Sequence, residues 1–101
     1  MISVNIRSKA GRVQGFTVKN HGRSEVCAAV SLLTLNTVNS IEALTDESFV
    51  YDYNSEGGFL KWDREGESPE VDLLLNAMVF GLKSVEENYG NEIMIKDDNY
   101  D

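Results

Sequence analysis

The first seven residues alternate between apolar and polar side chains, with the apolar ones at Ile2, Val4 and Ile6. This period of two is typical of a strand with one buried face. The tripeptide Lys9-Ala10-Gly11 is typical of a hairpin turn, so we predict a second strand over residues 12–19. The apolar phase of that strand changes between Val13 and Phe16, and Gly15 indicates a β-bulge there.

A long helix is predicted to begin at Ser24, a residue type that caps helices. Apolar side chains and one threonine then recur at spacings of three and four residues, at Val26, Val30, Leu33, Thr37, Ile41 and Leu44. Asn36 and Asn39 are poor helix formers, so the helix is expected to depend on burial of its apolar face.

A second hairpin is predicted beyond this helix, with strands over residues 48–54 and 58–64 and a glycine-containing turn between them. Its first strand carries aromatic side chains on one face, at Phe49, Tyr51 and Tyr53. Its second strand has Leu60 and Trp62 on a common face. The pattern is compatible both with aromatic residues that fill the core and with aromatic residues that serve an interface.

The second helix has clear boundary signals. Ser68 suits the N-cap, Pro69 the first helical position and Gly90 a left-handed C-terminal cap. The apolar stripe between them consists of Val71, Leu74, Leu75, Met78, Leu82 and Val85. A last strand is predicted over residues 92–96, and the acidic residues 97–101 are predicted to form a loose tail.

The predicted order is therefore strand, strand, helix, strand, strand, helix, strand. With short connections, this order indicates an α+β fold in which a mixed or antiparallel sheet carries both helices on one face. A length of 101 residues suits a single domain spanning residues 1–101.

The net charge of −8, from 17 acidic and 9 basic residues, narrows the possible partners. No cluster of Lys and Arg is present, which argues against nucleic-acid binding. An acidic surface attracts basic peptides or proteins, although it also serves solubility alone. One cysteine excludes an internal disulfide, and the apolar runs are far shorter than a membrane span. We therefore expect no membrane partner and a cytoplasmic location.

The only histidine and the only cysteine, His21 and Cys27, are separated by five residues. With Ser24 as the cap, Cys27 would be the third residue of the helix, where free N–H groups and the helix dipole favour a thiolate and offer oxyanion-hole donors. His21 would end the preceding strand and take the thiol proton, and Gly22 would turn the chain with a positive φ. The pattern is therefore compatible with a nucleophile–base pair of the kind used in cysteine proteases.

Other roles for these residues are compatible with the same pattern. A lone cysteine near a helix start is more often a small buried hydrophobe than a nucleophile. One histidine and one cysteine cannot supply the three or four ligands of a usual metal site, so no metal is expected. No glycine-rich phosphate loop precedes a helix, and no cofactor is expected.

The run Val26-Cys27-Ala28-Ala29-Val30-Ser31, preceded by His21-Gly22, resembles the signature of the ribosomal-processing cysteine proteases, the Prp family. The resemblance extends over nearly the whole chain. It implies a small homodimer that removes an N-terminal extension from the L-twenty-seven protein of the large ribosomal subunit, with cleavage after an aromatic pair. The alternative is a non-catalytic, ribosome-associated binding module of the same fold.

Residue roles follow from the resemblance. It implies that Cys27 is the nucleophile and His21 its general base. Ser31, one helical turn beyond Cys27, would line the site, although a serine inside a helix also bonds back to a carbonyl. Gly22 and Ser24 would support the site or the bound substrate.

The sequence departs from the family pattern in three places. Asn20 stands where a glycine is usual before the histidine, and Ser24 stands where many members have an acidic residue. The segment between His21 and Cys27 is short, whereas many members have a longer glycine-rich loop, which is expected to act as a substrate lid. The residue that orients His21 is left open, with Glu25 and Ser24 as candidates.

Overall fold

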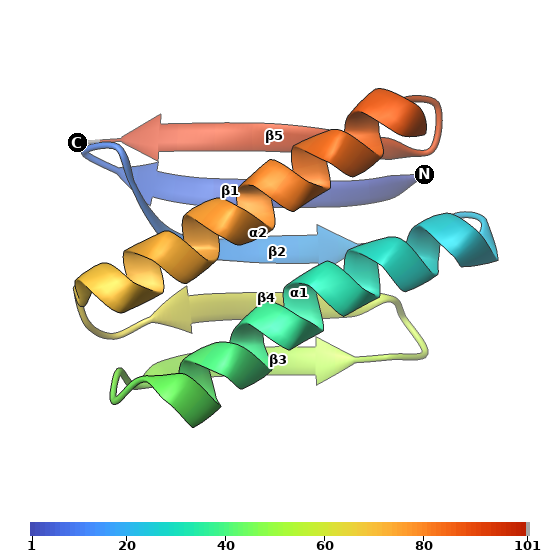
Figure 1. Cartoon of the computed structure of the whole chain (residues 1–101). Coiled ribbons are helices and arrows are strands. Elements are labelled where there is room, and N and C mark those ends of the chain that lie inside the picture. Colours follow the sequence, from blue (N-terminus) through green and yellow to red (C-terminus); the bar gives the residue numbers. More distant parts are fainter. Residues whose placement is uncertain (101) are drawn as a thin grey trace.

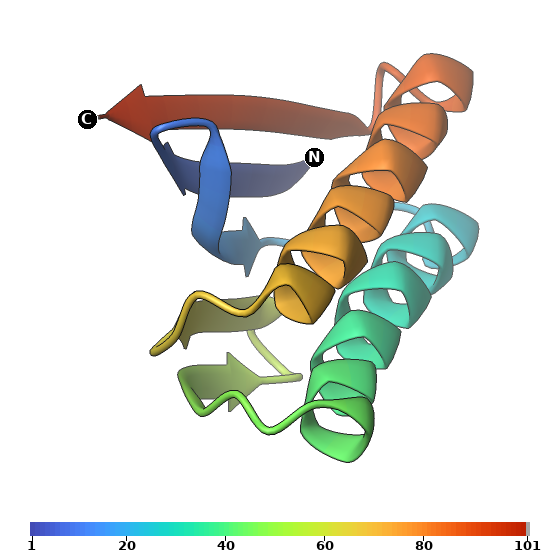
Figure 2. The same cartoon turned by 60° about the vertical axis from the view of Figure 1, so that its left-hand side comes forward.

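The computed structural model describes residues 1–100 and contains five strands and two helices in the predicted order (Figure 1). The elements are β1 (Ile2–Lys9), β2 (Arg12–Lys19), α1 (Ser24–Leu44), β3 (Phe49–Asn54), β4 (Phe59–Arg64), α2 (Pro69–Asn88) and β5 (Ile93–Tyr100). Both helices cover the same face of the sheet (Figures 1 and 2). The α+β fold with two helices on one face is therefore confirmed.

The strand order in the sheet is β3-β4-β2-β1-β5. β5 pairs with β1 in parallel, and the other neighbouring pairs are antiparallel. The sheet is therefore mixed. α2 connects β4 to β5 across the helical face, so β5 runs in the same direction as β4 and β1. Short turns join β1 to β2 and β3 to β4, whereas β2 reaches its antiparallel neighbour β4 through α1 and β3.

The hairpin of β1 and β2 has the predicted turn and bulge. Ala10 and Gly11 both take the left-handed backbone, with φ of 52° and 78°, as a tight two-residue turn requires. The pairing register shifts beside Gly15. One extra residue on β2 then lets Val13 and Phe16 both face the core, which explains the change of phase in the sequence.

The core lies between the sheet and the helices. Its largest fully buried side chains include Trp62 and Phe16, whose rings stack at 5.6 Å between centroids, and the alternating residues of β1. α1 is long and apolar enough by length and composition to cross a membrane. In this fold it acts as a core helix, because its face carrying Val26, Val30 and Ile41 is buried. The prediction that Leu44 joins this face is wrong, since Leu44 is exposed at the last turn.

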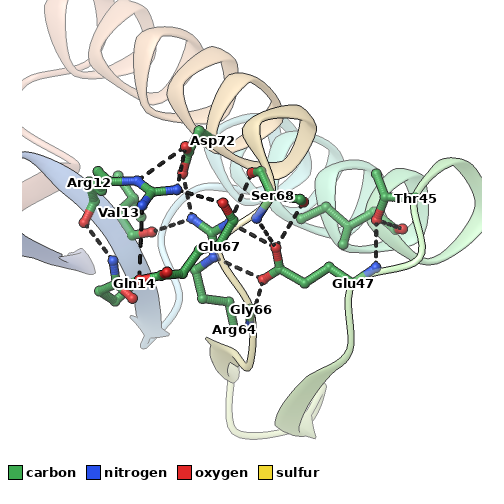
Figure 3. Close-up of polar contacts among 11 residues, drawn as sticks. Arg12, Val13, Gln14, Thr45, Glu47, Arg64, Gly66, Glu67, Ser68 and Asp72 are labelled. Atoms are coloured by element: carbon green, nitrogen blue, oxygen red, sulfur yellow. Dashed lines mark hydrogen bonds and ion pairs between the residues drawn. The ribbon is translucent and has the colours of Figure 1, made fainter.

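The start of α2 is fixed by an ion cluster that sequence reasoning missed (Figure 3). Arg64 uses all five of its N–H groups. They reach both carboxylate oxygens of Glu47, one of Asp72, and the carbonyls of Val13 and Ser68. Ser68 is the N-cap, as predicted, but its hydroxyl donates to Glu47 and accepts no hydrogen bond from the first turn of α2. The cluster ties the loop after α1 to the end of β4 and to the start of α2.

Two predictions near the C-terminus are wrong. The C-cap of α2 is Tyr89, and Gly90 does not adopt a left-handed conformation. Residues 97–100 of the predicted tail are not loose but extend β5, which pairs with β1 as far as Lys9 and Tyr100. Backbone hydrogen bonds to β1 order this polar segment, and its side-chain pattern does not reveal them. Asp101 lies outside the described residues.

Candidate active site

The start of α1 differs by one residue from the prediction. The N-cap is Arg23, so Ser24 is the first helical residue and Cys27 the fourth. The N–H of Cys27 already donates to the Arg23 carbonyl at 2.9 Å. Within residues 1–100, no hydrogen bond engages the N–H groups of Ser24, Glu25 or Val26. The free donors of the first turn therefore precede the cysteine.

The half-buried thiol of Cys27 lies against Gly22. The N–H of Gly22 donates to Sγ at 3.1 Å, and Sγ lies 3.4 Å from the Gly22 carbonyl. An N–H aimed at sulfur stabilises a thiolate. The predicted positive φ at Gly22 is wrong, since Asn20 takes that conformation, with φ of 74°. A Cβ on Gly22 would lie 3.3 Å from Ile2, so the segment packs closely there.

His21 is exposed, and its ring reaches the turn between β3 and β4. Its Nε2 lies 3.0 Å from the carbonyl oxygen of Glu56. Gly58 lies directly against the ring, since a Cβ there would come 2.9 Å from Nε2. In the part of the chain that the structure describes, no hydrogen bond joins His21 to Cys27.

The two residues considered as orienting groups for His21 do not contact it through hydrogen bonds among the described residues. The carboxylate of Glu25 pairs with Arg23. Ser24 is exposed on the first turn of α1, and no side-chain cap hydrogen bond is formed there. The contact from Glu56 could not be found by spacing, because it comes from a backbone atom 35 residues away in the sequence.

One cavity of about 230 Å³ brings three predicted residues together. His21, Cys27 and Ser31 all line it, whereas Gly22 and Ser24 do not. Cys27 and Ser31 share its wall because residues four apart lie on the same helix face. No hydrogen bond among residues 1–100 uses the hydroxyl of Ser31, so the serine does not bond back to its own helix.

A second groove of about 260 Å³ continues from this cavity between α1 and β3. The two share Leu35, Tyr53 and Leu60 in their walls. Tyr51 also lines the groove, and it is 63% exposed. Phe49 lines the inner side of the groove and packs on Trp62 of the core, with 5.5 Å between ring centroids. The aromatic residues of β3 therefore divide between core and open surface.

Among residues 1–100, no group of three or more His, Cys, Asp or Glu side chains has an arrangement that could hold a metal ion. The side chains that line the cavity include the thiol of Cys27, the imidazole of His21 and the hydroxyl of Ser31.

Comparison with known proteins identifies the family of this site. The family model described as cysteine protease Prp matches residues 1–94. The ribosomal processing cysteine protease Prp of Staphylococcus aureus is 30% identical over 103 residues, which cover 94% of this chain and 97% of the relative.

Solved structures agree with this match. The S. aureus ribosomal processing protease Prp, crystallised with a covalently linked product peptide, superimposes with a TM-score of 0.91 at 29% identity, covering 96% of this chain and 99% of that one. A protein of Streptococcus mutans superimposes with a TM-score of 0.87 at 26% identity, covering 98% of this chain and 95% of that one. The resemblance predicted from the run around Cys27 is confirmed: the chain belongs to the Prp family and is a cysteine protease.

Proposed function

We propose that this protease removes the N-terminal extension of the ribosomal protein L-twenty-seven during ribosome assembly, with Cys27 as nucleophile and His21 as general base. The observation that carries the proposal is that both side chains line one open cavity in a chain of this family. Ser31 lines the same cavity from one turn further along α1.

The reaction proceeds in two steps, acylation of Cys27 and hydrolysis of the thioester. His21 takes the proton of Cys27, and the thiolate attacks the peptide carbonyl to form a tetrahedral oxyanion. When the oxyanion collapses, the C–N bond breaks and the imidazolium gives its proton to the leaving amine, which leaves a thioester on Cys27. Water then attacks the thioester with His21 as base, which releases the carboxylic acid and restores the thiol. We assign stabilisation of the oxyanion to the free N–H groups of the first turn of α1, which precede Cys27.

Structures of a relative support covalent chemistry on a peptide. The S. aureus Prp was crystallised with a substrate peptide and with a covalently linked product peptide. The groove beside the cavity of this chain has exposed aromatic walls at Tyr51 and Tyr53, which suit the aromatic pair before the cleaved bond. The charge of −8 favours a basic ribosomal substrate.

We also propose that the protein is a cytoplasmic homodimer, as the resemblance implies. Large apolar side chains on the outer helix faces support an interface. Leu32, Leu73 and Phe80 are each at least 70% exposed, and such side chains are frequent in contact surfaces. Light scattering coupled to gel filtration would decide this point, since a mass near that of one chain contradicts the dimer.

The test of the proposed function is incubation with the extended L-twenty-seven protein of the same host, followed by mass measurement. We expect the extension to be lost with the wild type. Cys27→Ser is expected to bind the substrate without cutting it. An intact substrate that is bound equally by both forms would favour the non-catalytic binding module. A host L-twenty-seven gene that encodes no extension would contradict the proposed substrate but not the protease activity.

A further inference from the structure

We infer that the backbone carbonyl of Glu56 orients His21 and thereby makes Nδ1, rather than Nε2, the proton-transferring nitrogen of the ring. The inference rests on the proposed function, because it concerns the base that serves Cys27. Glu56 is here a positioning residue that acts through its main chain and does not touch the substrate.

The geometry assigns the tautomer. The Glu56 oxygen lies 3.0 Å from Nε2 of His21. A carbonyl oxygen can only accept a hydrogen bond, so Nε2 must carry the hydrogen. In the neutral ring the other nitrogen then has a lone pair, which leaves Nδ1 as the atom that accepts a proton from the thiol.

The turn that carries this carbonyl is held in shape by its own hydrogen bonds. The side-chain oxygen of Asn54 accepts from the N–H groups of Glu56 and Gly57 at 3.1 and 3.2 Å, and the N–H of Gly58 donates to Ser55 at 3.3 Å. These contacts occupy N–H groups of the turn, so the Glu56 carbonyl is presented outward in a defined direction.

Gly58 packs directly against the imidazole ring of His21. Its φ of 60° lies in the left-handed region. A Cβ at this position would lie 2.9 Å from both Cε1 and Nε2 of His21 and 2.7 Å from the Asn20 carbonyl. Gly57, one residue earlier, has room, since a Cβ there would meet only Asn54 at 3.7 Å or more. The two glycines therefore form a matched pair for experiment.

The carbonyl contributes to both halves of the reaction. Before attack it holds the ring in the tautomer that has a free Nδ1. After the thiol proton has moved to Nδ1, the carbonyl dipole stabilises the imidazolium through the Nε2–H bond. The proton on Nδ1 then passes to the leaving amine, while the Nε2 hydrogen stays in place throughout.

The first experiment is nitrogen NMR of the ring, which is unambiguous because His21 is the only histidine. The full chain carrying Cys27→Ala is labelled with ¹⁵N and measured at about pH 9, where an ordinary imidazole is neutral. We expect a protonated-type shift at Nε2, an unprotonated-type shift at Nδ1, and a nuclear Overhauser contact from ring Hε1 to Gly58. An Nδ1–H pattern, or the averaged shifts of a ring free in solution, would overturn the inference.

The second experiment compares Gly58→Ala with Gly57→Ala. Gly58→Ala is expected to lower kcat about a hundredfold, the usual effect of a misplaced catalytic group, with KM nearly unchanged and ring shifts that average between the tautomers. Gly57→Ala is expected to match the wild type. Equal kcat and equal ring shifts in both variants would contradict the inference. If no cleavage is ever observed, the proposed function fails, and the ring shifts still decide the tautomer.

Discussion

Glu47 and Arg64 form a two-point ion pair in which both contacts measure 2.8 Å and the side chains are 4% and 1% exposed. The carboxylate also accepts from the backbone N–H groups of Gly66 and Ser68. The pair therefore joins the loop after α1 to the end of β4 and to the turn into α2, which follows β4 directly in the sequence. The hydrogen bond from Arg64, above all, lowers the pKa of Glu47 from 4.5 to about 2.

Glu47→Ala is expected to destabilise the protein by about 3–5 kcal/mol, because it leaves a buried guanidinium without its partner. Urea denaturation would measure this loss. Glu65→Ala is the matched control, since Glu65 is exposed and forms no ion pair among residues 1–100, and it is expected to change stability by less than about 0.5 kcal/mol. Similar unfolding midpoints for the two variants would contradict the role of the pair.

The same pair predicts how stability depends on pH. Because the folded pKa of Glu47 lies below the unfolded value, its contribution is fully present above about pH 4.5 and is lost as the pH falls through about 2. The shift corresponds to about 3 kcal/mol. The pKa of Asp72 is lowered as well. Burial raises this pKa, but hydrogen bonds from Arg12 and Arg64 outweigh burial and hold it below 3.8. Denaturation series between about pH 6 and pH 2 should show this loss in the wild type and much less of it in Glu47→Gln.

Much of the fold could be predicted from local patterns. The alternation at Ile2, Val4 and Ile6 and the stripe around Leu75 each reflect one buried face, and each lies where predicted. The extent of β5 could not be predicted, because its polar residues 97–100 are ordered by backbone pairing with β1. Long-range partners of this kind leave no mark in the periodicity of a single segment.

The candidate site was predictable only in part. The spacing of His21 and Cys27 indicated a shared site, and both do line one cavity. Sequence reasoning could not find the Glu56 contact, because a carbonyl is present at every residue and only the folded turn selects one of them. The glycine pair Gly57-Gly58 indicated a hairpin turn, but nothing in the sequence indicated that this turn contacts His21.

Leu75→Ala is expected to cost about 2–5 kcal/mol, because Leu75 is fully buried and its truncation leaves a cavity. Leu73→Ala removes the same atoms from a side chain that is 70% exposed on the same helix, and is expected to cost much less. Thermal and urea denaturation of the two variants would test this. A loss for Leu73→Ala as large as that for Leu75→Ala would contradict the burial of Leu75.

His21→Ala is expected to reduce the rate of acylation by about a hundredfold or more, the usual scale for the loss of a general base. Folding should be unaffected, because His21 is exposed. Single-turnover measurement of the covalent adduct by mass spectrometry separates acylation from binding. The unfolding midpoint of the variant serves as the control. An acylation rate within a factor of about three of the wild type would remove His21 from the mechanism.

Tyr53→Ala is expected to weaken recognition of an aromatic substrate residue, because Tyr53 lies in the walls of both the cysteine cavity and the adjoining groove. The loss of an aromatic contact worth about 0.5–1.5 kcal/mol should lower kcat/KM by up to about tenfold. Val50→Ala is the matched control, since Val50 is an exposed residue of the same strand and lines neither the cavity nor the groove. A substrate with alanine in place of the aromatic residue completes a double-mutant cycle. If Tyr53→Ala lowers kcat/KM equally for both substrates, Tyr53 does not contact the aromatic substrate residue. The groove is then not the subsite that binds this residue.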